Sequence, residues 1–256
     1  MRQPRLASVI ERRILVNYRV DPLIAAPLLP AGLRPQQING WAVAGICLIR
    51  LGKVRPQWMP GGLGLRSENA AHRIAVEWDG SDGPETGVYI PRRDSSSIVN
   101  VMAGGHLFPG EHHRATFQVR ETPHDMQVAY TSHDGVTSVS VDASMTETLQ
   151  GSAVFADLEE ASAFFQHGST GFSATCDGRH LDGMQLNTNA WHVEPLAVNA
   201  VRSSFFDDQH RFPPGSTALD SALVMRDVPV TWKPLPPTTA ANASSLVSAG
   251  NTAPSE

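Results

Sequence analysis

Apolar and polar residues alternate along much of the chain, which is the period of a β-strand with one face buried. Between 12 and 20 the even positions from 14 onward are apolar, whereas Arg13, Asn17 and Arg19 share the other face. The segment 40–51 is apolar at nearly every position, which predicts a well-buried strand. Further strands are predicted at 72–78, 87–91, 115–119, 126–130, 136–141, 172–176, 184–188, 191–193, 222–225 and 228–232. The segment 197–206 fits either a strand or a helix.

Capping residues mark a few short helices between these strands. Asp21 followed by Pro22 predicts a helix that ends before residue 30, and Asp94 with the serines after it predicts one over 98–104. Asp157 and the glutamate three residues later predict a helix that Gly168 ends. Most strands follow one another directly, and the Asp-Gly turn at 134–135 predicts a hairpin, so the order of elements favours an up-and-down barrel.

The pattern indicates one β domain over 12–234, preceded by an N-terminal extension at 1–11. Beyond Lys233 the composition changes to Pro, Thr, Ala, Ser and Asn, and no apolar period continues. Such a segment buries too little apolar surface to offset the entropy lost on ordering. We therefore expect 235–256 to be a disordered tail.

Composition excludes several classes of function. The net charge of −5, with no long run of Lys or Arg, argues against nucleic acid and anionic membranes as partners. No stretch approaches the ~18 apolar residues of a spanning helix, so we expect a soluble cytoplasmic protein, with self-association left open. The two cysteines, Cys47 and Cys176, form no CxxC motif. We expect both to act as small buried hydrophobic residues. No cofactor motif is present in the sequence.

The stretch 104–117 carries the densest chemistry, with three histidines between a glycine pair and a strand. Histidine is the usual general base near neutral pH, which makes His112 and His113 catalytic candidates. As neighbours on a strand they face opposite sides, so only one of them lines a given cavity. His106 is a candidate binding residue. A metal site built from the three is disfavoured, because no His-x-His or HExxH spacing occurs.

A second group of ionisable residues runs through 65–73 into a strand. Glu68 is a candidate acid or base, and Arg66 or Arg92 is a candidate for binding a carboxylate through two hydrogen bonds. Asn100, inside the predicted helix at 98–104, is a further candidate for lining a cavity. Each also has a purely structural interpretation, as a surface strand residue or a salt-bridge partner.

Several phrases of the chain resemble a bacterial family of conserved proteins without an assigned activity, itself similar to the acetoacetate decarboxylase superfamily. The phrases are RRILVNY at 12–18, ENAAHR at 68–73, GVYIPRR at 87–93, LFPG at 107–110, LEEASAFF at 158–165, VEPL at 193–196 and DSAL at 220–223. The resemblance implies a mainly β protein, a closed antiparallel β-barrel of acetoacetate decarboxylase-like type with a few short helices and a small polar cavity.

The resemblance also implies what this chain lacks. In the decarboxylases a Gly-Phe-Pro-Lys-Lys phrase carries the lysine that forms a Schiff base, whereas the similar phrase here ends in the pair His112 and His113. The only lysines are Lys53 and Lys233, and imidazole does not form the imine. Lysine-dependent decarboxylation is therefore disfavoured. Glu68 lies roughly where the decarboxylases keep a cavity glutamate.

Two functions remain open from the sequence. In the first, the barrel binds a small carboxylate or oxo acid, and Glu68 with His112 or His113 transfers protons, as in a lyase, dehydratase or isomerase without an imine. In the second, a barrel with the same pocket binds a small molecule and leaves it unchanged.

Overall fold

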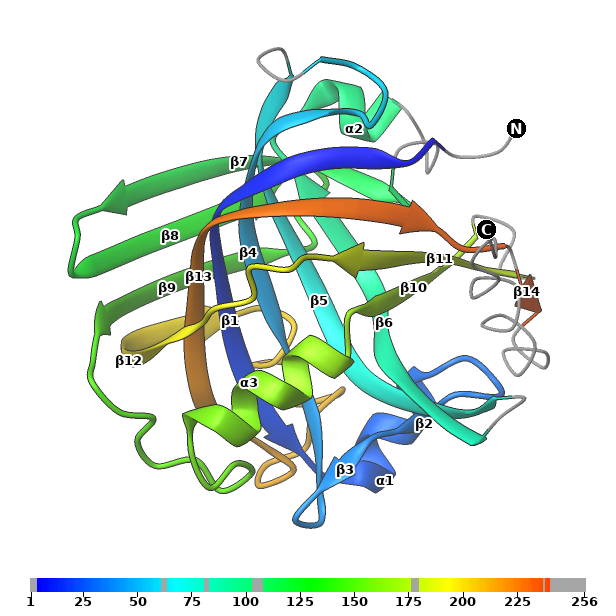
Figure 1. Ribbon diagram of the computed structural model, residues 1–256. Coiled ribbons are helices and arrows are strands. Elements are labelled where there is room, and N and C mark those ends of the chain that lie inside the picture. The colour runs from blue at the N-terminus through cyan, green and yellow to red at the C-terminus, as the bar shows by residue number, and fades with distance from the viewer. Residues whose placement is uncertain are drawn as a thin grey trace.

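The computed structural model describes residues 4–60, 64–80, 83–102, 108–175, 180–236 and 238–239, and they form a mainly β protein (Figure 1). Four long strands dominate it: β1 (Leu6–Val20), β4 (Trp41–Pro56), β5 (Leu65–Gly80) and β13 (Thr217–Pro234). The others are β2 (Arg34–Pro35), β3 (Gln37–Ile38), β6 (Gly83–Ser95), β7 (His112–Glu121), β8 (Asp125–Ser132), β9 (Ser138–Met145), β10 (Thr170–Ala174), β11 (His180–Asn187), β12 (Glu194–Ser203) and β14 (Thr238–Thr239).

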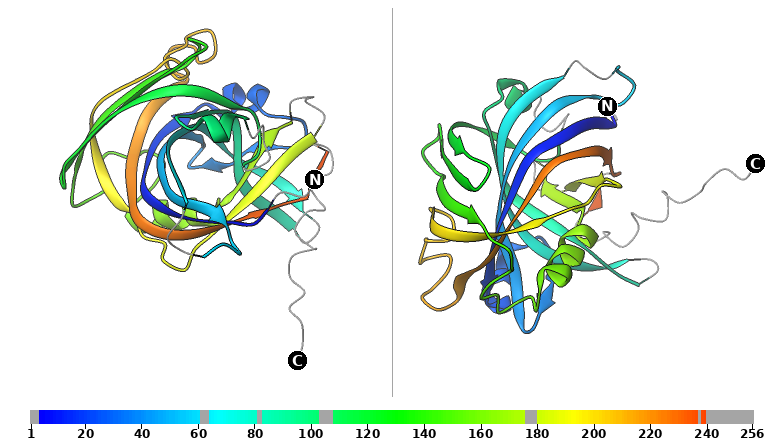
Figure 2. Two further views of the ribbon diagram at one scale, coloured as in Figure 1. Left: turned by 90° about the horizontal axis from the view of Figure 1, so that it is seen from above. Right: turned by 60° about the vertical axis from the view of Figure 1, so that its left-hand side comes forward.

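Strand pairing runs in a ring. Hydrogen-bonded neighbours lead from β5 through β6, β7, β8, β9, β12, β13, β1 and β4 back to β5. Seen from above, these strands curve round a common centre (Figure 2). A second path joins β13 to β6 through β11 and β10. The pairs are antiparallel, as expected, except that β6 runs parallel to both β7 and β10 over two or three residues.

The central strands are buried on both faces, and each face belongs to a different hydrophobic core. Ile14 and Val16 of β1 pack in the first core with side chains of β8 and β9. Leu15, the residue between them, packs in the second core with Cys47 of β4 and Met184 of β11. Because neighbouring residues on a strand face opposite sides, odd and even positions enter different cores over 14–20 of β1 and 42–51 of β4.

Three short helical segments and one longer helix complete the fold. They are α1 (Pro22–Ala25), the 3₁₀ turn η1 (Ala26–Leu28), α2 (Ile98–Met102) and α3 (Leu158–His167). The Asp157 side chain caps α3 by accepting a hydrogen bond from the Glu160 amide at 2.9 Å, which confirms the predicted capping. Ala161 and Phe165 of α3 pack in the second core. The helix therefore covers the side of β1 and β4 that faces away from β8 and β9.

Several elements differ in extent from those that the periodicity predicts. The expected strands at 222–225 and 228–232 are one continuous strand, β13, in which Asp227 takes a positive φ of 53° between them. The ambiguous segment at 197–206 is mostly strand β12, whereas 191–193 is not a strand. Sheet pairing explains the longer strands, because hydrogen bonds continue wherever a neighbour lies alongside, whatever the local pattern.

Ordered structure also reaches into both segments expected to lie outside the domain. β1 begins at Leu6, whose side chain is fully buried, and its first residues pair with β13. At the other end the Leu235 amide donates to the Gly183 carbonyl at 2.9 Å, and β14 pairs with β11. The remainder of the expected tail, 240–256, lies outside the described residues. Among the described helices, none is long and apolar enough to cross a membrane.

We expect Asp157→Ala to destabilise the protein by about 1 kcal/mol, because the first turn of α3 loses its capping acceptor. Chemical denaturation measures this change. Glu159→Ala is the matched control, since this exposed carboxylate lies in the same turn without a capping contact, and its effect should stay within about 0.5 kcal/mol. If both variants lost the same free energy of unfolding, the Asp157 hydrogen bond would contribute nothing beyond the negative charge that it adds to the first turn of α3.

Candidate functional site

A cavity of about 100 Å³ lies on the side of the sheet that α3 covers. Its apolar wall includes Ile49, Ile90, Phe108, Met184, Leu186 and Trp232. Its polar residues are three arginines, Cys47 and Ser169, and no carboxylate is among the described residues that line it. This volume is below the roughly 300–1,000 Å³ of pockets for drug-sized ligands, so the cavity suits a small molecule.

The three arginines come from β1, β5 and β6 of the same sheet and reach the same face through the sheet register. Arg13 of β1 lies opposite Ile49, and Arg73 of β5 lies opposite Gly45. Arg93 of β6 lies opposite Ala71, which in turn lies opposite Cys47. Residues opposite each other in paired strands share a face. The antiparallel register therefore brings three guanidinium groups, distant in sequence, to one cavity.

Arg73 is the most deeply buried of the three, with 3% of its surface exposed. One of its terminal nitrogens donates to the Asn17 side chain, and its guanidinium lies over the ring of Phe165 at 4.6 Å from the ring centre. Its Nε and Nη1 are buried without a hydrogen-bond partner. Burial lowers its pKa to about 10, so the group remains a cation near neutral pH. A buried cation with two free donors is costly unless an anion joins it.

Glycine at position 45 makes room for this guanidinium. A Cβ atom there would lie 2.4 Å from the Val16 carbonyl oxygen and 3.2 Å from Nη2 of Arg73. Real Cβ atoms do not approach backbone oxygen so closely, and any side chain would push the strand or the guanidinium away. Gly45 is thus part of the arrangement that places Arg73.

Arg93 and Arg13 are also without an acidic partner in the described part of the chain. Nε of Arg93 donates to the Ser173 hydroxyl at 3.2 Å, and burial lowers its pKa to about 10. Nε of Arg13 donates to Sγ of Cys47 at 3.2 Å. None of the ion pairs among the described residues includes Arg13, Arg73 or Arg93. The cavity therefore holds three positive charges, and the described residues that line it supply no compensating negative charge.

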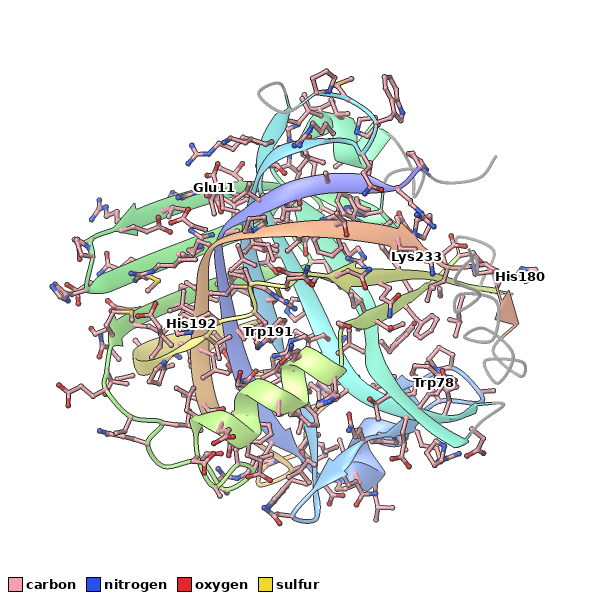
Figure 3. The ribbon with its side chains drawn as sticks, viewed as in Figure 1. Glu11, Trp78, His180, Trp191, His192 and Lys233 are labelled. Carbon is pink, nitrogen blue, oxygen red and sulfur yellow. The ribbon has the colours of Figure 1, made fainter. Side chains whose placement is uncertain are left out.

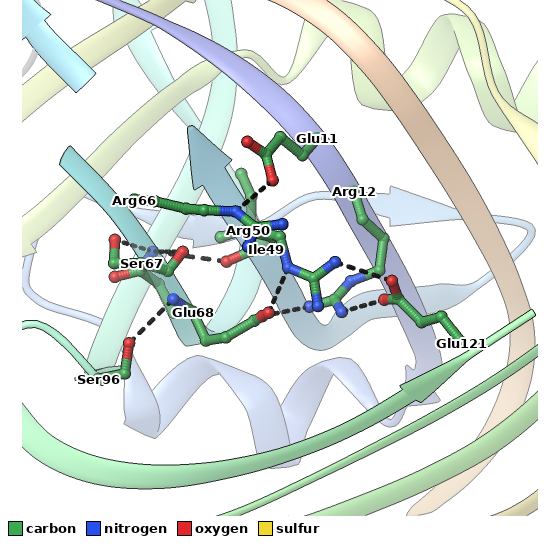
Figure 4. Close-up of polar contacts among 10 residues, drawn as sticks. Glu11, Arg12, Ile49, Arg50, Arg66, Ser67, Glu68, Ser96 and Glu121 are labelled. Carbon is green, nitrogen blue, oxygen red and sulfur yellow. Dashed lines mark hydrogen bonds and ion pairs between the residues drawn. The ribbon is translucent and has the colours of Figure 1, made fainter. Parts of the chain in front are cut away.

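The carboxylate of Glu68, a predicted acid or base, is held by two arginines (Figure 4). It accepts from Arg12 at 2.6 Å and from Arg50 at 2.5 Å, and the same two arginines also hold Glu121. The predicted carboxylate binder Arg66 is 65% exposed and pairs with Glu11 at 2.7 Å. Neither Glu68 nor Arg66 lines the cavity.

Arg92 and His113 lie together, on the face opposite the cavity. Arg92 donates to Asp94 at 2.9 Å and to Asp134 at 2.8 Å, and Nδ1 of His113 is 3.2 Å from Asp134. Tyr130 completes the group through a 3.5 Å contact with Asp94. Burial raises the pKa of Asp94 despite the opposing effect of Arg92. Arg92 already has two carboxylate partners, which leaves it a weak candidate for binding a third.

His112 lies on the same side of the sheet as the cavity arginines. The parallel pairing of β6 and β7 sets His112 opposite Arg93 and His113 opposite Asp94. Both ring nitrogens of His112 are buried without a well-formed hydrogen bond, and its ring centre is 6.5 Å from that of Phe108, which lines the cavity. Burial and the nearby Arg93 charge lower its pKa to about 3, so the ring is neutral near neutral pH.

Two other predicted binding residues are not tested by these contacts. His106 lies outside the described residues. The backbone of Asn100 belongs to α2, but its side chain is not described. In the described part of the chain, no three His, Cys, Asp or Glu side chains lie close enough together to hold a metal ion.

Sequence patterning missed the cavity arginines because it treated one face of each strand as solvent-facing. Arg13 and Arg73 lie on the faces expected to be polar, and those faces form the second core. The continuous apolar run at 40–51 could have predicted the burial of these arginines. A strand that is apolar on both faces is covered on both faces, and the strands beside it are then covered on both faces too. An arginine on such a strand is then a buried charge.

Both lysines of the chain lie away from the cavity lining. Lys233 of β13 (Figure 3) follows Trp232, which lines the cavity, so its side chain leaves the strand on the opposite face. Lys53 is exposed. A Schiff base with a ligand in this cavity therefore has no amine to form it.

Comparisons with known proteins place the chain in a family without an assigned activity. The model of a family described as "Uncharacterized conserved protein", DUF2071, matches residues 9–226. Among curated proteins, no sequence matches this chain.

Solved structures share the fold at low sequence identity. An acetoacetate decarboxylase-like enzyme from Sphingomonas wittichii is 11% identical with a TM-score of 0.62, covering 93% of this chain and 94% of that one. The enduracididine biosynthesis enzyme MppR, complexed with pyruvate, is 15% identical with a TM-score of 0.56, covering 94% and 91%. Acetoacetate decarboxylase from Legionella pneumophila is 10% identical with a TM-score of 0.56, covering 89% and 87%. The likeness shows an acetoacetate decarboxylase-like fold.

We expect Glu121→Gln to destabilise the protein by about 1–3 kcal/mol near neutral pH, because Arg12 and Arg50 lose a charged acceptor. Burial alone would raise the pKa of Glu121, but its hydrogen bonds and charge interactions with Arg12 and Arg50 outweigh burial and lower it below 4.5. A lowered carboxyl pKa adds stability above the unfolded-state pKa, and this stability is lost as the pH falls through the folded-state pKa. The variant should therefore lose less stability than the wild type on acidification below about pH 4.5.

Urea denaturation across the acid range measures both effects. Arg66→Gln is the control, since its exposed pair with Glu11 should contribute only about 0–1 kcal/mol. A parallel acid dependence in the wild type and Glu121→Gln would mean that the Arg12–Arg50–Glu121 contacts do not set the acid stability.

Proposed function

We propose that this chain, which belongs to the DUF2071 family of uncharacterized conserved proteins, binds a small carboxylate or 2-oxo acid in the cavity lined by Arg13, Arg73 and Arg93. One observation carries the proposal: three guanidinium groups line a small cavity, and none has a carboxylate partner among the described residues. Guanidinium is suited to carboxylate because its N–H groups match the spacing of the two oxygens.

Size and fold both favour an oxo acid. A cavity of about 100 Å³ holds only a few heavy atoms, and its apolar wall suits a short carbon chain beside the charged end. Pyruvate is bound to MppR, which shares the fold. We further propose that β13, β1, β4, β5, β6, β10 and β11 form a closed barrel around the cavity, which keeps water from the ligand and strengthens its ion pairs.

The carboxylate would lie among arginines that have no carboxylate partner in the described part of the chain. Arg73 supplies two free buried donors, Nε and Nη1, and Arg93 and Arg13 add charge from the neighbouring strands. Filling these donors removes the cost of burying them, so binding and folding stability are linked. Arg66 and Arg92 stay outside this proposal because carboxylates of the chain already hold them.

Proton transfer is the second part of the proposed function, and His112 is the residue that fits it. The neutral ring accepts a proton, and a bound anion beside Arg93 would offset the positive charge that now lowers the His112 pKa. His113 faces the Arg92 group instead. We propose that Glu68 holds β1, β4 and β5 together rather than transferring protons, because Arg12 and Arg50 occupy both of its oxygens.

The alternative is a carrier that binds the same anion without changing it. The observation in its favour is that the His112 nitrogens are buried and the ring is not among the cavity-lining residues. The two functions share the arginine site and differ only in turnover.

We expect Arg13→Gln and Arg93→Gln each to weaken pyruvate binding by roughly 1.5–3 kcal/mol, or about tenfold to a hundredfold, because each removes a charged donor from the anion. Isothermal titration calorimetry measures the affinities, with circular dichroism to confirm folding. Arg66→Gln removes the same charge from the surface and should leave the affinity unchanged. If Arg66→Gln weakened binding as much as Arg13→Gln, the ligand would lie outside the arginine cavity.

We expect the protein to exchange the methyl protons of pyruvate in deuterated buffer, since His112 would take a proton from the carbon next to the carbonyl and return a deuteron. Proton NMR follows the loss of the methyl signal. His112→Gln should slow exchange by roughly 10²–10⁴-fold, the usual contribution of a positioned base, and His113→Gln should change it little. Tight binding without exchange above the buffer rate would identify a carrier.

A further inference from the structure

Cys47 lies in the arginine cavity, and the proposed function gives it no role. Its side chain lines the cavity, and it is a free cysteine. Nε of Arg13 donates to its Sγ at 3.2 Å, and the sulfur also interacts electrostatically with Arg73 and Arg93. A buried thiol that only packs in a core has apolar neighbours, whereas this one has three guanidinium groups around it.

A second observation, the unpartnered nitrogens of Arg73, points to an anionic ligand beside this sulfur. Arg73 is 3% exposed, lines the same cavity, and keeps Nε and Nη1 without partners. Register places these groups close together: Cys47 lies two residues from Gly45 on the same face of β4, and Gly45 lies opposite Arg73. An anion that satisfies Arg73 is therefore held within the cavity that also contains the thiol.

We propose that Cys47 is a nucleophilic thiol that reacts with small carboxylates carrying an electrophilic carbon, bound by Arg13, Arg73 and Arg93. This inference rests on the proposed anion-binding function of the same cavity. The arginines hold the carboxylate and thereby bring the carbon to the sulfur, which converts a collision between two molecules into a reaction within one complex. Electropositive surroundings are those in which reactive cysteines occur.

Iodoacetate is a suitable probe because it combines a carboxylate with one electrophilic carbon. The Cys47 sulfur forms a bond to that carbon, the carbon–iodine bond breaks, iodide leaves with the bonding electrons, and the thiol proton passes to solvent. Iodoacetamide carries the same reactive carbon on a neutral amide of similar size. The ratio of the two rates therefore measures the contribution of the negative charge.

The experiment alkylates the folded full-length protein with each reagent and measures modification at Cys47 by peptide mass spectrometry, which separates it from Cys176. Glutathione in the same buffer gives the intrinsic rate ratio of a free thiol. At Cys47 the iodoacetate-to-iodoacetamide ratio should exceed that of glutathione by about tenfold or more, since binding raises the local concentration of the anion. Pyruvate should slow the reaction by competing for the arginines.

Two variants separate this inference from the proposed function. Arg93→Gln should bring the rate ratio at Cys47 back toward that of glutathione, whereas Arg66→Gln should not change it. A Cys47 rate ratio equal to that of glutathione would overturn the inference. So would an unreactive Cys47 in a protein that binds pyruvate by calorimetry, and the binding proposal would then stand. Absence of both pyruvate binding and reactivity would refute the two proposals together.

Discussion

Side chains of the central strands alternate between two hydrophobic cores, and the remaining architecture depends on this double burial. β1 and β4 have no solvent-facing side over most of their length, so most of their apolar residues fit one core or the other. β8 and β9 cover the first core, while α3 and β11 cover the second. Where a polar residue of these strands is buried, its partners decide whether it stabilises the fold or is available for a ligand.

The arginines of the sheet divide into two groups on this basis. Arg12, Arg50 and Arg92 each contact two carboxylates, and such paired charges hold neighbouring strands together. Arg13, Arg73 and Arg93 instead have neutral partners, namely a thiol, an amide and a hydroxyl. Neutral acceptors orient a guanidinium without cancelling its charge. The second group thus concentrates positive charge beside a largely apolar cavity, where electrostatic attraction for an anion is stronger than in water.

The shared fold does not by itself determine the chemistry of the cavity. Acetoacetate decarboxylase-like structures cover about nine-tenths of this chain, yet identity of 10–15% leaves almost every cavity position free to differ. Neither lysine of this chain lies at the cavity, so the amine needed for an imine is lacking there. What the cavity offers instead is guanidinium, a thiol and, behind Phe108, a neutral imidazole.

The sequence by itself determined the mainly β class, the capped helix at 158–167 and the opposite orientation of adjacent strand residues, because these depend on local periodicity and capping. It also argued against a lysine-based site, since neither of the two lysines directly follows the Phe-Pro phrase at 108–109. Only the tertiary structure decided which charges are paired and which are not. The sequence alone does not distinguish Arg66 from Arg93. In the fold, Glu11 lies beside Arg66, whereas Ser173 lies beside Arg93. The physical reason is that pairing across a sheet is set by the register between strands distant in the chain, which no local pattern contains.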